Sequence, residues 1–431
     1  MFLRLPKRAP GWIFVPLALL CTVSLAYFSI LNARAAYAAG LNTRSGYERA
    51  TQLEPGNAEY WYLLGRYWQY NLEEPGAQRA VRYYRASLAL DPRAADTWLD
   101  LGTVYELEGN TQAAREAFAQ AKRAYPLSAE VSWRYGNFLL RQNEVPQAFA
   151  EIHRTVHVDP KRSGEAVSLC WRVDPDIRSI LDNVLPPDRD AYLDVIQVLG
   201  AQEQFAAALQ VWARLVALHP RLELSQAITF TFTLVEKYQI GDARRVWSDA
   251  VRLSTTPALR DPPGSLLWDG GFESGVSGGG FAWYFPPASN GVRTTLDSKE
   301  RHSGRQSLRV NFDGRHNVNL DGICNNAEVQ PGTPHLFSAW VRTYALTTDQ
   351  GVRFRLFWKE SSRYFSIETS DVRGTQPWTQ IQLTWTPPKD VHQVRVCVGR
   401  DPSTKFDSQI QGTAWLDDVA LVPQFVANSQ P

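Results

Sequence analysis

The stretch TWLDLGTVYELEGNTQAAREAFAQAKRAYP, residues 97–126, predicts the fold of the first half of this 431-residue chain. Its apolar residues recur every three or four positions, which is the period of an amphipathic α-helix. Small residues such as Gly102 and Ala114 let two helices approach closely, while Trp and Tyr side chains fill the space between them. The stretch therefore predicts a packed pair of helices that ends at Pro126.

The same pattern recurs on both sides of this stretch. Pro92, Pro126 and Pro160 are spaced 34 residues apart, and Pro55 precedes Pro92 by 37, which indicates a three-residue insertion near NLEEPG. Weaker copies follow at 191–220 and 241–251, whereas 164–190 departs from the pattern. We expect a helical array over residues 36–258, irregular near 163–190.

The recurring positions resemble the tetratricopeptide repeat. In residues 97–126 the matching positions are Trp98, Leu101, Gly102, Tyr105, Ala114, Phe118, Ala121 and Pro126. The resemblance implies an all-α solenoid whose concave face binds a partner protein or peptide. Tyr70 and Arg134 are exposed candidates for that contact.

The N-terminus reads as a membrane anchor. Arg4, Lys7 and Arg8 precede an uncharged stretch over residues 12–31, and twenty helical residues span roughly 30 Å, the thickness of the bilayer core. The positive flank predicts that residues 1–11 are cytoplasmic and that the bulk of the chain is extracytoplasmic, periplasmic or at the cell surface. The alternative is a cleaved secretory signal, with ARA at 33–35 as the cleavage site.

Composition excludes several classes of function. Forty-five Lys and Arg balance 44 Asp and Glu, so nothing favours a nucleic-acid partner. The four cysteines lie far apart without the spacing of a zinc site. The common catalytic motifs of hydrolases, nucleotide enzymes and metalloproteases are missing from the sequence, so we expect no enzymatic activity.

The pattern changes near residue 260. STTPALRDPPG, residues 254–264, breaks the helical periodicity, and we take 259–266 as a linker. Alternating strands with Gly, Pro, Asn and Asp turns then fill 267–425, followed by a tail at 426–431. We therefore expect an antiparallel sandwich of the jelly-roll type.

Four segments of this region resemble the jelly-roll carbohydrate-binding modules attached to xylanases and glucanases. In order they are LLWDGGFES at 266–274, SKERHSGRQSLRV at 298–310, VQPGTPHLFSAWVR at 329–342 and GTAWLDDVALVP at 412–423. The resemblance implies a domain that binds a polysaccharide. Sandwiches of this shape also serve as plain structural or protein-binding domains.

The resemblance also implies a structural calcium ion. Glu273 and Asp417 would be its ligands, with Asp418 as the alternate, and backbone carbonyls near Arg301 and His302 would complete the shell. Two other roles for Glu273 stay open. It is either part of a metal-free turn or strand clamp, or a catalytic acid, which would need a second carboxylate across a cleft.

Sugar recognition needs flat aromatic faces and planar polar groups. The candidates are Trp283, Tyr284, Tyr344, Trp358 and Tyr364, with Arg342, Arg355 and Glu368 as polar partners. GGGFAWYFPP, residues 278–287, is the favoured loop because it is flexible and rich in aromatics. Cys324 and Cys397 are candidates for a disulfide, which would persist outside the cytoplasm.

These observations predict a membrane-anchored adaptor that docks a protein through its repeats and a polysaccharide through its sandwich, in a cell-envelope polysaccharide assembly or export system. Two alternatives remain. One is a structural scaffold whose sandwich binds no sugar, and the other is an accessory subunit of an envelope enzyme.

Overall fold

The computed structural model describes residues 11–72, 74, 76–254, 263–287 and 291–424, and the side chains of 11–13 are not among them. Arg4, Lys7 and Arg8, the first half of the expected linker at 259–266, and the tail at 426–431 therefore lie outside the described residues. The chain divides into two compact units, Met1–Pro186 and Pro187–Pro431, and each is described by itself.

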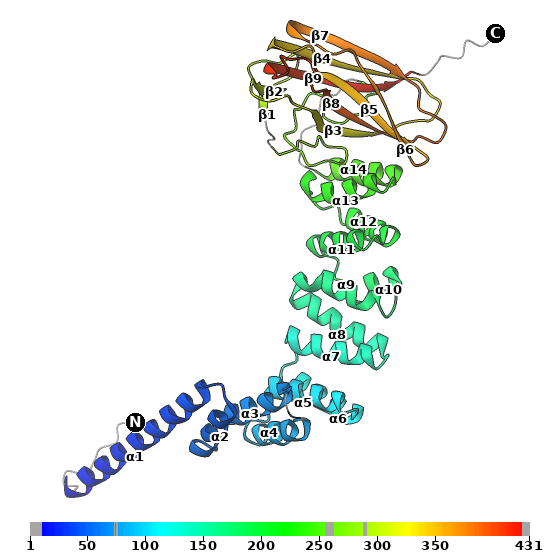
Figure 1. Ribbon diagram of the computed structural model, residues 1–431. Helices are drawn as coiled ribbons and strands as arrows, with labels where there is room; N and C mark the ends of the chain where they lie inside the picture. Colours follow the sequence, from blue (N-terminus) through cyan, green and yellow to red (C-terminus); the bar gives the residue numbers. More distant parts are fainter. Residues whose placement is uncertain (1–10, 73, 75, 255–262, 288–290, 425–431) are drawn as a thin grey trace, which may run out of the picture. The chain divides into compact units, whose positions relative to one another are not determined.

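The first unit is all helical (Figure 1). Its α-helices are α1 (Gly11–Gly40), α2 (Arg44–Leu53), α3 (Ala58–Tyr70), α4 (Ala77–Leu90), α5 (Ala95–Leu107), α6 (Thr111–Ala124), α7 (Ala129–Arg141), α8 (Val145–Val158), α9 (Ser163–Trp171) and α10 (Ile177–Asn183). Neighbours pack as hairpins, α1 with α2, α3 with α4, α5 with α6 and α7 with α8. The expected helical array is confirmed.

Small residues let the helices of each hairpin approach closely. A Cβ atom placed on Gly65 would lie 2.6 Å from the ring of Tyr84, and one on Gly102 would lie 3.1 Å from the ring of Phe118. Both rings are fully buried. The glycines therefore make room for the aromatic side chain of the second helix, as the repeated sequence pattern predicts.

Helix α1 has two distinct parts along its length. An apolar segment over Phe14–Gly40 is long enough to cross a membrane, although a signal sequence passes the same test. Its last turns belong to the repeat array, because Ala35 is completely buried and the carbonyl of Ala38 would meet a Cβ on Gly46 at 2.4 Å. The apolar segment thus continues without a break into the first hairpin.

The helices become short where the sequence departs from the repeat pattern. A 3-10 turn over Pro160–Arg162 precedes α9, which has 9 residues, and α10 has 7. The other repeat helices of this unit, α2 to α8, have 10 to 14 residues.

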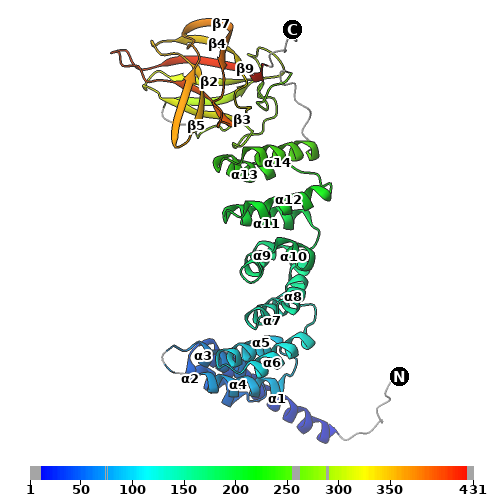
Figure 2. The same ribbon diagram turned by 90° about the vertical axis from the view of Figure 1, so that its right-hand side faces the viewer.

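The second unit begins with four more helices and ends in a β-sandwich (Figures 1 and 2). The helices are α11 (Arg189–Ala201), α12 (Phe205–Ala217), α13 (Leu224–Glu236) and α14 (Ile240–Leu253). They pack as two hairpins, α11 with α12 and α13 with α14. These four helices thus share one compact unit with the sandwich.

Two antiparallel sheets form the sandwich. The strands are β1 (Val292–Asp297), β2 (Ser307–Asp313), β3 (Leu320–Glu328), β4 (His335–Leu346), β5 (Arg353–Glu360), β6 (Arg363–Glu368), β7 (Gly374–Trp385), β8 (Gln393–Arg400) and β9 (Gln411–Pro423). One sheet has the order β1-β2-β9-β4-β7 and the other β3-β8-β5-β6. The expected all-β antiparallel fold is confirmed, and the sheets form no closed barrel in the described residues.

Strand alternation builds the core between the sheets. In β4 the side chains of Phe337, Ala339 and Val341 are completely buried, and those between them are not. In β5 the completely buried side chains are those of Phe354 and Leu356. Because successive side chains point to opposite faces, the residues between them lie on the outer surfaces of the two sheets.

One expected strand is a turn. The expectation of strands from residue 267 onward is wrong at WDGGFE, residues 268–273, because the first strand in the described residues is β1, at Val292. Asp269 and Phe272 have positive φ angles of 56° and 60°, which bend the chain. The turn still runs beside β9, since the N–H of Val419 donates to the carbonyl of Gly270.

Candidate functional site

A cleft of about 340 Å³ lies on the outer face of the four-stranded sheet. Its lining residues are Glu236, Tyr238, Asp321, Cys324, Phe357, Trp358, Lys359, Tyr364, Gln393, Arg395 and Cys397. Nine of these belong to the sandwich, and Glu236 and Tyr238 belong to the end of α13 and the turn that follows it. The cleft combines aromatic faces with charged groups, which is the composition that sugar recognition requires.

Tyrosines and a lysine form one end of the cleft. The hydroxyls of Tyr238 and Tyr364 lie 3.3 Å apart, and burial together with this hydrogen bond raises the pKa of Tyr238 to about 12. The ammonium of Lys359 lies 4.7 Å from the ring centre of Tyr238 and 5.8 Å from that of Tyr364. Tyr364 remains 73% exposed, so one ring face is open to a ligand.

An arginine network closes the opposite end of the sheet face. The guanidinium of Arg355 pairs with Glu368 at 3.0 Å and with Asp401 at 2.6 Å. Arg353, on the same strand, also contacts both carboxylates, at 2.6 and 3.3 Å. These bonds hold the planar groups of Arg355 and Glu368 in place.

A disulfide forms part of the cleft surface. Cys324 of β3 and Cys397 of β8 are directly opposite each other in the sheet, and their sulfurs are bonded. The other two cysteines, Cys21 and Cys170, are free thiols. The candidate pair from the sequence is thus joined in the structure.

Two polar atoms of lining residues lack partners among the described residues. The Trp358 Nε1 and the Gln393 Oε1 are both buried and form no hydrogen bond there. A buried polar group without a partner costs about 1–3 kcal/mol.

The structure divides the predicted sugar-binding residues among three places. Tyr284, Trp358, Tyr364, Arg355 and Glu368 belong to the four-stranded sheet or its edge, where Tyr284 pairs with Cys324 through two backbone hydrogen bonds. Arg342 and Tyr344 belong to β4 in the other sheet, where Arg342 pairs with Glu300 at 2.8 Å. Trp283 lies in the core.

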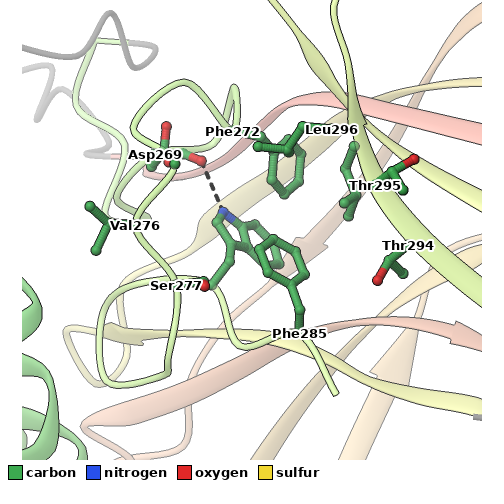
Figure 3. Close-up of a pocket in the computed structure, with 11 residues that line it drawn as sticks. Asp269, Phe272, Val276, Ser277, Phe285, Thr294, Thr295 and Leu296 are labelled. Atoms are coloured by element: carbon green, nitrogen blue, oxygen red, sulfur yellow. Dashed lines mark hydrogen bonds between the residues drawn. The ribbon is translucent and has the colours of Figure 1, made fainter. Parts of the chain in front are cut away.

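Trp283 lines a second, mostly apolar cavity of about 240 Å³ (Figure 3). Its side chain is 1% exposed, and its Nε1 donates to the carbonyl of Asp269 at 2.9 Å, the dashed line in the figure. The Asp269 carboxylate accepts hydrogen bonds from the backbone of Glu273 and Ser274. The buried Trp283 indole exposes no ring face to a sugar, and the Asp269 carboxylate already accepts hydrogen bonds from the chain. We therefore place the candidate site on the sheet face.

The glycine run before Trp283 packs against helix α13. A Cβ atom on Gly279 would lie 2.7 Å from the ring of Phe232, and one on Gly280 would lie 2.8 Å from the Thr231 hydroxyl. Phe281 and Trp268 lie beside Trp247 of α14, at ring-centre distances of 6.5 and 5.0 Å. The loop that the sequence favoured for sugar binding is thus covered in part by the last helical hairpin.

The predicted calcium ligands lie at the other sheet, around Gly271. A Cβ atom there would lie 3.5 Å from the Cγ of Glu273 and 3.8 Å from the Oδ1 of Asp417, so the two carboxylates flank this glycine. Each also accepts backbone hydrogen bonds, Asp417 from His302 and Ser303 and Glu273 from Arg305. Burial raises the pKa of Asp417 to about 6.

The donor set fits calcium only in part. Glu273 and Asp417 supply the oxygen ligands that calcium prefers. The carboxylate of Asp418 instead contacts His302 and Ser303, and the guanidinium of Arg301 donates to the carbonyl of Ser298. No group of three or more His, Cys, Asp or Glu side chains within the described ranges could hold a metal, so further ligands would be backbone oxygens.

The first unit carries a separate polar groove. On α5, Asp100 is 4% exposed; it accepts a hydrogen bond from the Tyr62 hydroxyl of α3 at 3.0 Å and from Arg134 of α7 at 2.9 Å. A cavity of about 410 Å³ lies beside it, lined in part by Glu59, Tyr62 and Asp96. The first helices of three successive hairpins thus share one polar surface. Tyr70 of α3 is 59% exposed.

Sequence reasoning missed several residues of the cleft. Phe357 and Lys359 of β5 and Arg395 of β8 alternate with residues that face the core. Strand alternation therefore places these three on the outer face, but only once the inward face is known. Glu236 and Tyr238 carry no such signal, because their pattern is that of an ordinary helix end.

Two family models match the chain. A carbohydrate binding domain matches residues 264–404, and a tetratricopeptide repeat matches 76–129 and 108–160. The chain therefore combines tetratricopeptide repeats with a carbohydrate-binding domain, and neither model describes a catalytic domain. A search of curated proteins found no match.

Solved structures show weak similarity to each part. The CBM22-1 xylan-binding domain from Paenibacillus barcinonensis Xyn10C is 15% identical over 39% of this chain and 100% of its own, with a TM-score of 0.28. YrrB, a repeat protein with an unusual peptide-binding site, is 16% identical over 49% of this chain and 93% of its own, with a TM-score of 0.27. A Clostridium thermocellum xylanase fragment complexed with xylohexaose is 14% identical over 31% of this chain and 25% of its own, with a TM-score of 0.24. These scores are too low to argue from, so the assignment rests on the family models.

Proposed function

We propose that this chain, which joins tetratricopeptide repeats to a carbohydrate-binding domain, is a non-catalytic adaptor anchored in a membrane. Its sandwich binds a polysaccharide and its repeats bind a protein partner, in the assembly or export of an envelope polysaccharide. The observation that carries the proposal is the cleft on the four-stranded sheet, where exposed aromatic rings lie beside fixed polar groups.

Affinity electrophoresis of the full-length chain in detergent tests the glycan-binding role. We expect gels that contain a matching polysaccharide to retard the protein, and Tyr364→Ala to abolish the retardation because it removes the most exposed ring of the cleft. Tyr344→Ala is the matched control, since Tyr344 is 62% exposed but lies on the other sheet. Loss of binding only in Tyr344→Ala would indicate that the binding site lies on the five-stranded sheet instead.

The structural-scaffold alternative makes the opposite prediction. If the sandwich serves only as a protein-binding or structural domain, no polysaccharide retards the wild-type chain. Co-purification with a separate catalytic chain would instead favour the role of an accessory subunit.

The polar groove of the repeats is the proposed protein-docking surface. Arg134 and Tyr62 both contact Asp100, and Tyr70 exposes its ring at the end of the same helix as Tyr62. Arg134→Ala is expected to weaken capture of the partner in a pull-down and to leave glycan retardation unchanged. A loss of both activities would indicate general unfolding instead.

Helix α1 supports the membrane anchor. Cleavage after the ARA sequence at 33–35 would remove most of this helix, including the buried Ala35, and would uncover part of α2. The full chain is therefore expected to keep its N-terminus and to remain in the membrane fraction after carbonate washing. N-terminal sequencing that begins at residue 36 would favour the cleaved signal.

A calcium ion at Glu273 and Asp417 would have a structural role. It would hold the 269–274 turn to the loop at 302–305 and to β9, which the backbone hydrogen bonds of the two carboxylates already join. We expect a chelator to lower the melting temperature and added calcium to restore it, and Glu273→Gln to remove the response. An identical melting curve with and without chelator, together with no calcium by elemental analysis, would favour the metal-free clamp.

A further inference from the structure

Two residues of the helical repeats form a wall of the cleft on the sandwich. Glu236 is the last residue of α13, and Tyr238 follows it with a positive φ of 59°. Glu236 pairs with Arg395 of β8, and the Tyr238 hydroxyl lies 3.3 Å from that of Tyr364 on β6. The carbohydrate-binding family model covers residues 264–404, so this wall lies outside the domain that the model describes.

Contacts away from the cleft hold this wall in place. Arg244 of α14 pairs with Glu328 of β3 at 3.5 Å. Trp247 packs edge-on against Trp268 at a ring-centre distance of 5.0 Å, and Phe232 of α13 fills the space beside Gly279. The position of the hairpin therefore does not depend on the single contact between Tyr238 and Tyr364.

The charges at this end of the cleft leave one cation available. Arg395 is paired with Glu236, whereas no carboxylate in the described part of the chain pairs with Lys359. Lys359 contacts the faces of Tyr238 and Tyr364 instead. Asp321 is the other carboxylate that lines the cleft, and it precedes Cys324 on β3. The strand register places Lys359 on the far side of Arg395 from the disulfide, so Lys359 and Asp321 lie toward opposite ends of the cleft.

From these contacts we infer that the cleft is a composite site for an acidic polysaccharide. The rings of Tyr238 and Tyr364 contact a sugar ring, and the ammonium of Lys359 pairs with the carboxylate of that sugar. The inference rests on the proposed glycan binding and adds two things to it. One is that α13 and its following turn belong to the binding site, and the other is that the ligand carries uronic-acid residues.

Affinity electrophoresis of the full-length chain in detergent can test both parts. The gels contain polygalacturonate or alginate as acidic probes, and xylan or laminarin as neutral ones. Tyr238→Asn removes the ring while keeping a residue that tolerates a positive φ, and Lys359→Gln removes the cation. Tyr125→Asn is the matched control, because Tyr125 is an exposed tyrosine directly after a helix of the first unit.

The acidic probes are expected to retard the wild-type chain more than the neutral ones. Tyr238→Asn and Lys359→Gln should each weaken binding to the acidic probe about tenfold, with an unchanged melting temperature, while Tyr125→Asn binds like the wild type.

Three results would overturn the inference in different ways. Unchanged binding in Tyr238→Asn, with loss in Tyr364→Ala, would remove the helical wall from the site but keep the proposed glycan binding. Equal retardation by neutral and acidic probes would remove the acidic ligand. No retardation of the wild type by any of the four probes would overturn the inference, and loss of the glycan-binding proposal would follow only if a wider set of polysaccharides also failed.

Discussion

Single buried groups set the response of the sandwich to pH. His335 of β4 is completely buried, its Nδ1 contacts the carbonyl of Thr333 at 2.7 Å, and its Nε2 has no hydrogen-bond partner among the described residues. Burial lowers the pKa of this imidazole below its ordinary value, although the Thr333 contact opposes the shift. His335 is therefore neutral in the folded chain around neutral pH.

His335 should contribute a fall in the free energy of unfolding as the pH drops from about 7 to about 5, and Asp417, whose pKa burial raises to about 6, contributes in the opposite direction. Over this range the unfolded chain takes up a proton at His335 that the folded chain does not bind, so acid favours the unfolded state. His335→Gln cannot titrate and is expected to lose less stability over the same range. Denaturant unfolding of both proteins at several pH values measures the difference, and parallel curves would contradict the prediction.

At the scale of elements, the sequence predicted most helices and strands because their patterns are local. Burial alternates over residues 335–343 of the stretch that forms β4, and residues 97–126 form most of α5 and all of α6. The sequence signals of β3 and β6 are weaker, because β6 is exposed along most of its length and β3 contains polar residues that are buried, so neither alternates clearly. Propensity does not identify such strands, since sheet neighbours determine them.

The candidate site was predicted only in part, for a related reason. Tyr364 and Arg355 were predicted from their residue types, and both lie on the face of the four-stranded sheet that carries the cleft. The sequence alone does not show which face of a sheet packs against the core. Trp283 has the composition of a sugar-binding residue and the environment of a core residue. Only the three-dimensional packing distinguishes these cases.

The contact between the glycine run and α13 gives a prediction at this scale. Gly279→Ala adds a Cβ atom 2.7 Å from the Phe232 ring at a φ of 97°, so it should destabilise the fold by about 2–4 kcal/mol. Gly275→Ala is the control, because Gly275 also has a positive φ but nothing lies within 4 Å. We expect it to cost only about 1–2 kcal/mol. Equal losses of unfolding free energy in the two variants, measured in urea, would show that the contact with the Phe232 ring does not contribute.

The packing of the repeat hairpins gives a second prediction at the scale of elements. Gly65→Ala places a Cβ atom 2.6 Å from the buried ring of Tyr84 and is expected to cost about 1–3 kcal/mol. Gly56→Ala, in the turn before α3, meets nothing within 4 Å and should leave the stability of the array nearly unchanged. Circular dichroism at 222 nm during thermal unfolding would record both, and similar melting temperatures would contradict the packing role of Gly65.

The whole molecule depends on its single disulfide for part of its stability. Cys324 and Cys397 are 73 residues apart, and a bond that closes a loop of this length typically stabilises the folded state by about 2–4 kcal/mol. Dithiothreitol should therefore lower the melting temperature of the wild type. It should not affect a Cys324→Ser/Cys397→Ser variant, because Cys21 and Cys170 are free thiols. A wild-type melting temperature that does not change with dithiothreitol would argue against the disulfide bond.

Helix α1 runs from Gly11 to Gly40 and packs against α2 at its end. With a bilayer around its first turns, this continuous helix would fix the orientation of the following repeats relative to the membrane. Each residue inserted between Leu31 and Ala35 would turn the first hairpins by about 100° and move them by about 1.5 Å. Partner recognition would then vary periodically with the number of inserted residues, as a flexible tether would not allow.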